Sequence, residues 1–394
     1  MTLRVELERH RRRAQSLMKE VVSPVAARID ADGLYPNEIF ERFAAEGFLA
    51  LSLPEQLGGS GLGVRGLTIA TEEAAQVSSA AGLMLLLTRL PAAPILAAGS
   101  REQAEEWLIP LGRGERRGSF ALSEPSSGSD PLGMACSARP VPGGWELHGT
   151  KAWVSGAEEA DWFVVVATTH PGERRPDSVR AFIVDADSPG LSVHPHQRAG
   201  GRGVSLGDVA LDKVFIPEVR RLPGVNGMAP LLNALATMRP VISARGTGLA
   251  AGALMLAAER MSSRLVGGKA LENRQGLQWR LADLVTRLES AQLLTERAAD
   301  LVDAGQSGPA VAGRLAMAKL ASSELAIDAA QFAAQVHGAE GCVLGHPADR
   351  YVRDARQLTI VEGTSEIQRN IIANSVVHRQ TWWRSDAEAK DVVA

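Results

Sequence analysis

The pattern of apolar and polar residues divides the chain into three folded parts and a tail. Residues 1–118 carry apolar positions at helical spacing, which predicts an N-terminal helical domain. Residues 119–225 contain short β-rich runs separated by Gly, Pro and Asp, which predicts a β domain. Long Ala- and Leu-rich helical patterns return over 226–378 and favour a bundle, whereas 379–394 form a polar tail. We therefore expect a mainly α protein with a β domain in its middle.

The composition is that of a folded soluble protein without a strong charge bias. The 394 residues are 45% hydrophobic and 22% charged, and the formal net charge is -3. This slightly acidic balance gives no electrostatic reason to expect nucleic acid as a partner. The basic run RHRRR at 9–13 has glutamates on both sides, which indicates a solvated helix face. No apolar run reaches the length of a membrane-spanning helix, so we expect no membrane partner.

Cysteine usage and the N-terminus predict a cytoplasmic protein. The two cysteines, Cys136 and Cys342, make no disulfide framework, which fits a reducing compartment. The N-terminus lacks the apolar core of a signal peptide. It also contains glutamates, whereas transit peptides are poor in acidic residues. The eight histidines show no metal-ligand spacing, so no metal site is expected.

The stretch GLGVRG at 61–66 matches the glycine pattern of dinucleotide-binding loops. Such a site requires the motif directly after a parallel strand, inside a β-α-β unit. Here the motif follows LPEQLGGS in a helical region, so we interpret it as a surface loop.

Two stretches of the predicted β domain are candidates for ligand contacts. The segment FALSEPSSGSD at 120–130 leads from a β run into a loop rich in hydroxyl groups and glycine. Such a loop can donate hydrogen bonds to an acceptor-rich ligand, although on the residues alone an ordinary turn is equally possible. Trp153 lies on a short strand, where it would pack in the core or stack on a flat cofactor.

The segment TIVEGTSEIQRN at 359–370 carries two carboxylates around a Gly-Thr-Ser turn. Ser365 and Gln368 match a capping box, which places Glu366 at a helix start, where its charge complements the helix dipole. The helix would bury a stripe formed by Ile367, Ile371 and Ile372. Glu362 has no such structural role and follows two apolar residues, which would raise its pKa and suit a general base. Glu362 is therefore the candidate catalytic residue.

Several motifs, in order along residues 20–378, together resemble the FAD-dependent acyl-CoA dehydrogenase family. The resembling stretches are PEQLGGSGLG, FALSEPSSGSD, LHGTKAWVSGAEEADW, FIVDADSPG, VFIPE, the RP at 239–240, RQGLQWRLAD, QVHGAEG and YVRDARQLTIVEGTSEIQR. The resemblance implies a barrel-like middle β domain and a C-terminal four-helix bundle. It also implies an FAD cofactor, an acyl thioester substrate, an electron-transferring flavoprotein as partner, and a homotetramer or homodimer.

Carried over residue by residue, the resemblance implies two groups of FAD contacts. Those in the middle domain are Phe120, Leu122, Ser123, Ser129, Trp153 and Ser155. Those in the C-terminal domain are Arg264, Gln275, Gln335, Gly338, Thr364 and Glu366, and His337 would lie in the same interface strip as Gln335 and Gly338. By this resemblance Trp153 and Ser155 lie beside the flavin ring, and Arg264 and Gln275 hold the pyrophosphate and adenosine half across a subunit interface.

The resemblance also implies the substrate site and the reaction. Arg239, Ser129 and Gly363 would lie at the thioester and its pantetheine arm, and Glu362 matches the catalytic base. The backbone N–H of Glu362 and a flavin hydroxyl would hold the thioester carbonyl while Glu362 removes the α-proton. Transfer of the β-hydride to the flavin would yield the 2-enoyl thioester.

Three departures from the family pattern keep other functions open. Gly267 replaces an aromatic residue after the pyrophosphate arginine, Ala236 replaces an aspartate before Arg239, and Val361 replaces a tyrosine before Glu362. These changes favour a specialised thioester, carried on CoA or on an acyl carrier protein. The alternatives are an acyl thioester oxidase, a flavin monooxygenase, and a non-catalytic or DNA-binding relative. Glu362 argues against a monooxygenase and a silent subunit, and the net charge argues against DNA binding.

Overall fold

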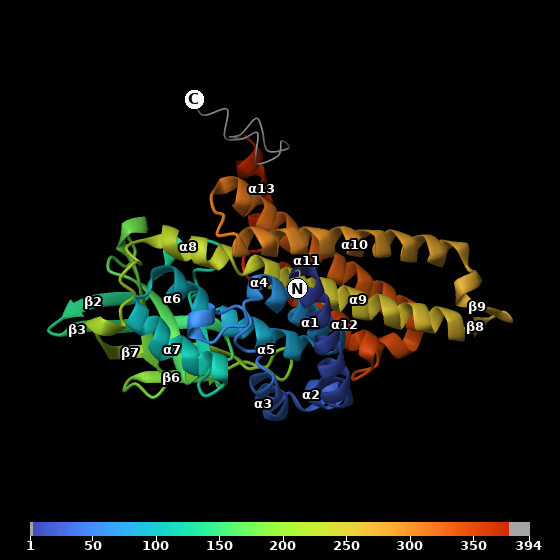
Figure 1. Ribbon diagram of the computed structural model, residues 1–394, viewed down its shortest axis with the longest axis horizontal. Coiled ribbons are helices and arrows are strands. Elements are labelled where there is room, and N and C mark those ends of the chain that lie inside the picture. The colour runs from blue at the N-terminus through green and yellow to red at the C-terminus, as the bar shows by residue number, and fades with distance from the viewer. Residues whose placement is uncertain (1–2, 378–394) are drawn as a thin grey trace.

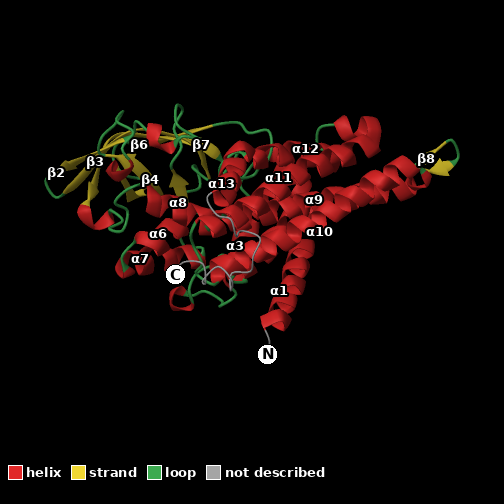
Figure 2. Cartoon of the chain, turned by 90° about the horizontal axis from the view of Figure 1, so that it is seen from above, coloured by secondary structure: helices red, strands yellow, loops and turns green. Residues whose placement is uncertain are grey.

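The computed structural model describes residues 3–377. The β domain lies at one end of the molecule, and three long helices extend from it to the other end (Figure 1, Figure 2). The predicted polar tail at 379–394 and residue 378 lie outside the described residues. The order helical, β, helical is the one that the sequence pattern predicts.

The N-terminal part is helical up to the first strand. Its helices are α1 (Leu3–Leu17), α2 (Ala26–Asp32), α3 (Asn37–Ala45), α4 (Gly63–Val77), α5 (Ser79–Arg89), α6 (Ala92–Ala98) and α7 (Arg101–Arg113). The apolar run across α4 and α5 is broken at Ser78, whose extended backbone and side chain cap α5 through the amide of Ala81. Ser78 therefore ends α4 and caps the start of α5.

The middle part is one seven-stranded sheet. Its strands are β1 (Gly118–Ala121), β2 (Ser137–Val141), β3 (Gly144–Ser155), β4 (Trp162–Thr168), β5 (Val179–Asp185), β6 (Leu191–Pro195) and β7 (Leu206–Pro217). The order is β1-β4-β2-β3-β7-β6, with β5 also paired to β4. The pairing β1–β4 is parallel, and β3–β7, β6–β7 and β4–β5 are antiparallel.

Strand β4 is buried along its whole length because both faces of the sheet are covered. Trp162, Val164 and Val166 share a core with α6 and α7. The alternate residues point into a second core with β3, β5 and β7. A strand packed on both faces needs a continuous apolar run, and WFVVVAT provides it.

The C-terminal part contains three long helices and three short ones. They are α8 (Met228–Ala236), α9 (Arg239–Ser263), α10 (Gln275–Asp303), α11 (Pro309–His337), α12 (Pro347–Arg356) and α13 (Ser365–Val377). A hairpin of β8 (Leu265–Val266) and β9 (Lys269–Ala270) joins α9 to α10 at the end of the molecule far from the large sheet (Figure 1). The bundle shares one hydrophobic core with α1 and α4 of the N-terminal part.

Two helical stretches are apolar and long enough to cross a membrane, contrary to the sequence expectation. They are Ser79–Ala98 and Met228–Ser263, and 78% of each scanned window is buried inside the fold. Burial of this extent is typical of core helices, because these stretches pack against other helices and against the large sheet of the same chain.

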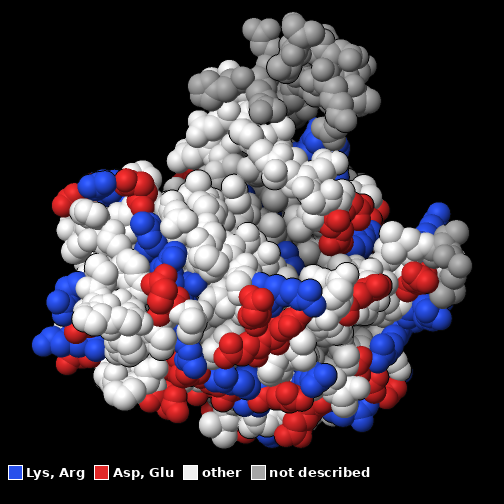
Figure 3. All heavy atoms as spheres, turned by 60° about the vertical axis from the view of Figure 1, so that its left-hand side comes forward, with Lys and Arg blue, Asp and Glu red and all other residues white. Residues whose placement is uncertain are grey.

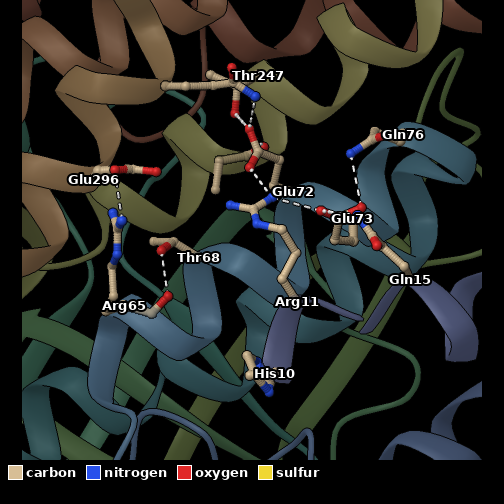
Figure 4. A network of polar contacts seen from close by, with 12 residues as sticks. His10, Arg11, Gln15, Arg65, Thr68, Glu72, Glu73, Gln76, Thr247 and Glu296 are labelled. Atoms are coloured by element: carbon tan, nitrogen blue, oxygen red, sulfur yellow. Dashed lines mark hydrogen bonds and ion pairs between the residues drawn. The ribbon is translucent and has the colours of Figure 1, made fainter. Parts of the chain in front are cut away.

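A buried polar network connects four helices at the centre of the molecule (Figure 4). Arg11 of α1 forms ion pairs with Glu72 and Glu73 of α4 at 3.1 and 2.6 Å. Glu72 also accepts hydrogen bonds from Thr247 of α9 and Gln292 of α10. The run at 9–13 is thus only partly a solvated face, because Arg11 pairs with buried carboxylates that need a cation.

The glycine motif at 61–66 is a loop only in its first two residues, because Gly63 begins α4. The Asp303 carboxylate accepts hydrogen bonds from the amides of Val64 and Arg65 at 2.7 and 2.8 Å. A carboxylate therefore occupies the helix N-terminus that a dinucleotide phosphate would need.

Surface charges of both signs are interspersed on the face shown in Figure 3, without a continuous patch of one sign. This arrangement gives no electrostatic footprint for nucleic acid on that face.

Candidate active site

Glu362 lies in a tight turn between the end of α12 and the start of α13. Its φ is 53°, and that of Gly363 is 89°, so two successive residues adopt the left-handed region. This region suits glycine but is uncommon for a residue with a side chain. The turn makes the backbone double back before α13 begins.

Glu362 is half-buried, and one oxygen of its carboxyl group is shielded and unpaired. Its Oε2 atom is shielded from solvent and has no hydrogen-bond partner among residues 3–377. Burial raises the pKa of Glu362 to about 7, against the opposing charges of Lys319, Arg239 and Arg245. A carboxyl group with this pKa can accept and release a proton near neutrality, which suits a general base.

Three cations from two helices act on Glu362 through their charges. Lys319 comes from α11, and Arg239 and Arg245 come from α9. Burial lowers the pKa of Lys319 to about 8 and also lowers that of Arg239. The Nε atoms of both arginines are buried without a hydrogen-bond partner in the described part of the chain. The site therefore holds unpaired donors beside an unpaired acceptor.

Sequence reasoning identified Arg239 but missed Lys319 and Arg245. Each interrupts an apolar helix, in AMAKLASS and VISARGTG, and each is at most 1% exposed. A lone cation within an otherwise apolar helical pattern was the signal that could have revealed Lys319 and Arg245.

The predicted capping box at the start of α13 is wrong. Thr364, not Ser365, caps the helix, because its Oγ1 accepts a hydrogen bond from the amide of Ile367 at 3.3 Å. Gln368 instead donates from Nε2 to the carbonyls of Glu362 and Gly363 at 3.1 and 3.0 Å. The left-handed turn at Gly363 places the cap one residue earlier than the sequence pattern suggested.

The predicted isoleucine stripe of α13 is also wrong. The buried residues are Ser365, Gln368 and Ser375, whereas the three isoleucines are half-buried. A Cβ atom at Gly313 of α11 would lie 2.2 Å from the Ser375 hydroxyl oxygen. Small and polar residues face α11 because the two helices approach too closely for larger side chains.

The predicted flavin loop lies directly beside the predicted flavin strand. Ser123 accepts a hydrogen bond from the amide of Ala152, and the Ser119 hydroxyl donates to the carbonyl of Ser155. Phe120 is 9% exposed, Leu122 and Ser123 are half-buried, and Ser129 is exposed. The fold thus brings the 120–123 segment next to Trp153 and Ser155.

A buried ion pair that sequence reasoning missed holds this loop in place. Lys151 Nζ lies 2.6 Å from the Glu124 carboxylate and donates to the Leu122 carbonyl at 3.0 Å. Glu124 also accepts from the amides of Ala135 and Cys136. Because both charges are buried and every partner is backbone or the opposite charge, the pair fixes the loop against β3.

Trp153 is not a core residue. It is 59% exposed, its φ is 60°, and its ring packs against the tilted ring of His196 with a centroid distance of 5.1 Å. His196 contacts the Asp208 carboxylate at 2.8 Å, and the same carboxylate accepts from the Trp153 amide. A tryptophan that is held at the surface by strained backbone presents an apolar face to a flat partner.

Two further predicted FAD contacts lie at the start of α13. Glu366 is exposed, and its own amide and the Thr364 hydroxyl lower its pKa. Glu366 therefore stays ionised while Glu362 titrates near neutrality, so the two acids of the motif occupy different electrostatic environments.

The remaining predicted FAD contacts lie at the end of the molecule that is far from the large sheet. Arg264, Gln275, Gln335 and Gly338 are exposed, and His337 is buried. An ion pair between Arg260 and Glu340 joins the end of α9 to the segment after α11 there. This end, marked by β8 and β9 in Figure 1, lies far from the large sheet. A single chain does not bring the two groups of contacts together.

Comparison with known proteins identifies the family of the chain. Residues 5–115, 119–214 and 226–377 match the models of the N-terminal, middle and C-terminal domains of acyl-CoA dehydrogenase. The chain belongs to the acyl-CoA dehydrogenase family.

Relatives and solved structures agree with this assignment. The chain is 37% identical over 363 residues to the mitochondrial short-chain specific acyl-CoA dehydrogenase of Mus musculus, covering 91% of this chain and 87% of that protein. It is 32% identical to the caffeyl-CoA reductase-Etf complex subunit CarC of Acetobacterium woodii, covering 92% and 95%. A glutaryl-CoA dehydrogenase from Mycobacterium smegmatis, solved in complex with FADH2, has a TM-score of 0.88 at 26% identity and covers 95% of each chain.

The chain is thus an FAD-dependent acyl-CoA dehydrogenase in fold, enzyme class and cofactor, as the sequence predicted. The residues present fit a flavin. Trp153 offers an exposed ring face, the adjoining loop offers backbone and hydroxyl donors, and the unpaired Oε2 of Glu362 remains for a substrate proton. Among residues 3–377 no group of three or more His, Cys, Asp or Glu is arranged to hold a metal ion.

Proposed function

We propose that this acyl-CoA dehydrogenase removes the α-proton of an acyl-CoA with Glu362 and forms the 2-enoyl thioester. The observation that carries the proposal is the buried, unpaired Oε2 of Glu362, on a carboxyl group whose pKa is raised to about 7. No other acid of the described chain combines burial, an unpaired oxygen and three neighbouring cations.

The residues of the chain divide the work of the reaction. Oε2 of Glu362 takes the α-proton, and burial favours the neutral acid that results. The Glu362 amide donates to the thioester carbonyl, which acidifies the α-carbon. A bound FAD would supply the hydride acceptor for the β-carbon, which balances the two-electron oxidation. Arg239, Gly363 and Ser129 border the thioester and its pantetheine arm.

FAD would be held by two subunits. Phe120, Leu122, Ser123, Ser129, Trp153, Ser155, Thr364 and Glu366 of one subunit would surround the flavin half. Arg264, Gln275, Gln335 and Gly338 of another subunit would hold the adenosine half. The separation of these groups within one chain supports this division and a homo-oligomer, either a dimer or a tetramer.

A short acyl chain and an electron-transferring flavoprotein fit the relatives best. The Mus musculus relative is named for short-chain substrates, and the Acetobacterium woodii relative is named as part of an Etf complex. We propose the same substrate class and the same kind of electron acceptor here, in the cytoplasm.

The test is anaerobic titration of the purified yellow protein with short, long and branched acyl-CoA esters, and with matching acyl-carrier-protein thioesters. Bleaching of the flavin by short acyl-CoA is expected. Glu362→Gln should bleach at least about a thousandfold more slowly, because it removes the proton acceptor. Glu41→Gln, an exposed acid on α3, is the matched control and should bleach like wild type.

Other outcomes would assign a different function. Bleaching only by acyl-carrier-protein thioesters would identify that class of thioester as the substrate. Rapid reoxidation by oxygen with formation of hydrogen peroxide would identify an oxidase. If no thioester bleached the protein, the proposed reaction would be wrong.

A further inference from the structure

Lys319 is a fully buried cation near the proposed base. It lies in the middle of α11 and is 0% exposed. Its Nζ atom donates a hydrogen bond to the carbonyl of Gly363 at 2.8 Å. No carboxylate of residues 3–377 lies within ion-pair contact of Nζ. A buried ammonium without a contacting anion is costly, so its retention requires a reason.

The carbonyl that Lys319 contacts belongs to the strained turn of Glu362. Gln368, which is also fully buried, donates from Nε2 to both the Glu362 and the Gly363 carbonyls. The Gly363 carbonyl therefore has two donors, one from α11 and one from α13. A Cβ atom on Gly363 would lie 2.7 Å from Gln368 Nε2, so this contact leaves no room for a side chain.

A left-handed glutamate persists only where its surroundings hold it. The two donors fix the two peptide planes that follow Glu362, and these planes limit where its carboxyl group can point. We propose that Lys319 is a positioning residue for the base, which clamps the Gly363 carbonyl together with Gln368 and so aims Glu362 at the acyl thioester. This role rests on the proposed function of Glu362.

The charge of Lys319 adds a second effect that can be measured separately. Among the cations facing Glu362, Lys319 from α11 is the one that lowers its pKa most, followed by Arg239 and Arg245 from α9. Glu324 and Glu366 face Lys319 from α11 and α13. Without the ammonium, Glu362 would hold its proton to higher pH, and the base would become available later in a pH titration.

Two substitutions separate the hydrogen bond from the charge. Lys319→Met removes both, whereas Lys319→Gln keeps an N–H donor and removes the charge. Gln368→Met removes the other half of the clamp and leaves every charge in place. Lys19→Met, at an exposed lysine of the N-terminal part, is the matched control.

The experiment measures the limiting rate of anaerobic flavin bleaching against pH, with the FAD-loaded protein and an acyl-CoA that bleaches wild type. Lys319→Met should lower the limiting rate about a hundredfold, the effect of misplacing a reacting group by about 1 Å. The rise of the bleaching rate on the acid side of the pH profile (the acid limb) should also move to higher pH in this variant. Lys319→Gln should recover part of the rate but keep the displaced limb. Gln368→Met should lower the rate without displacing the limb.

Flavin content and thermal unfolding establish that each variant is folded. A purely structural role would change these two readouts and leave the pH limb where wild type has it, which would overturn the proposal. The same holds if Lys319→Met and Gln368→Met bleached at the wild-type rate. If Lys319→Met failed to fold, Lys319→Gln and Gln368→Met would decide the question. If none of the thioesters bleached the wild-type protein, the proposed function would be wrong, and the positioning role of Lys319 would be wrong with it.

Discussion

Glu362 shows how burial and neighbouring charges together set the pKa of a single carboxyl group. Removal from water penalises its charged form, and three cations compensate only in part, so that its pKa reaches about 7. Glu366, four residues later, has the opposite setting, because it is exposed at a helix start where backbone amides stabilise its charge. Two acids in one short motif therefore serve different purposes.

The raised pKa of Glu362 predicts a pH-dependent stability difference. In the unfolded chain the group titrates near 4.5, and in the folded protein near 7. The folded state thus binds the proton more tightly, so this contribution to stability is present below pH 4.5 and is lost as the pH rises to 7. At pH 8, Glu362→Gln should be more stable than wild type by up to roughly 3 kcal/mol.

Thermal unfolding of the FAD-loaded proteins at pH 8 and pH 5 checks this expectation. The midpoint of Glu362→Gln should exceed that of wild type at pH 8, and the difference should shrink at pH 5. Glu41→Gln should show no such pH dependence. Equal midpoints for Glu362→Gln and wild type at both pH values would contradict the proposed burial of the charge.

At the scale of elements, helix α4 depends on a residue from another part of the chain. Its first amides are bonded by Asp303, the last residue of α10, more than two hundred positions away. Helix N-termini need such acceptors, and Leu62, the residue that precedes α4, has no side chain that could provide one. The sequence around α4 gives no sign of this cap.

We expect Asp303→Ala to lower the free energy of unfolding by about 1–2 kcal/mol, because the lost helix cap leaves two amides at the start of α4 without their acceptor. Thermal unfolding at neutral pH measures the effect. Asp300→Ala, at a carboxylate on the same helix that is 66% exposed, is the control and should change the midpoint little. A loss of stability in Asp300→Ala as large as in Asp303→Ala would show that helix composition, and not the cap, is responsible.

At the scale of the whole molecule, the predicted FAD contacts lie at two ends of one chain. Exposed apolar residues gather near the second end, on α9, β8 and α10. They are Met255, Leu265, Val266 and Trp279. Surfaces of this kind mark protein interfaces, which agrees with an FAD site shared between subunits.

Light scattering should therefore give the mass of a dimer or a tetramer for the FAD-loaded protein. Trp279→Asp should shift the mass towards the monomer and lower the FAD content together with it, because the buried charge would weaken the interface. Leu34→Asp, at a residue that is 69% exposed in the N-terminal part, should change neither quantity. A monomer with full FAD content would rule out the shared site.

The sequence by itself determined the order of the three parts, the long helices, the strands and the family, because periodicity and motif order are local properties of the chain. It also singled out Glu362 as an acid without a helix-capping role. Only the tertiary structure decided that Thr364 caps α13, that Arg11 points inward and that Lys319 and Gln368 hold the turn at Gly363. The contacts of Arg11 and Lys319 join residues distant in sequence, and the local contacts of Thr364 and Gln368 depend on the left-handed turn at Gly363. The burial that shifts the pKa of Glu362 exists only after the helices have packed.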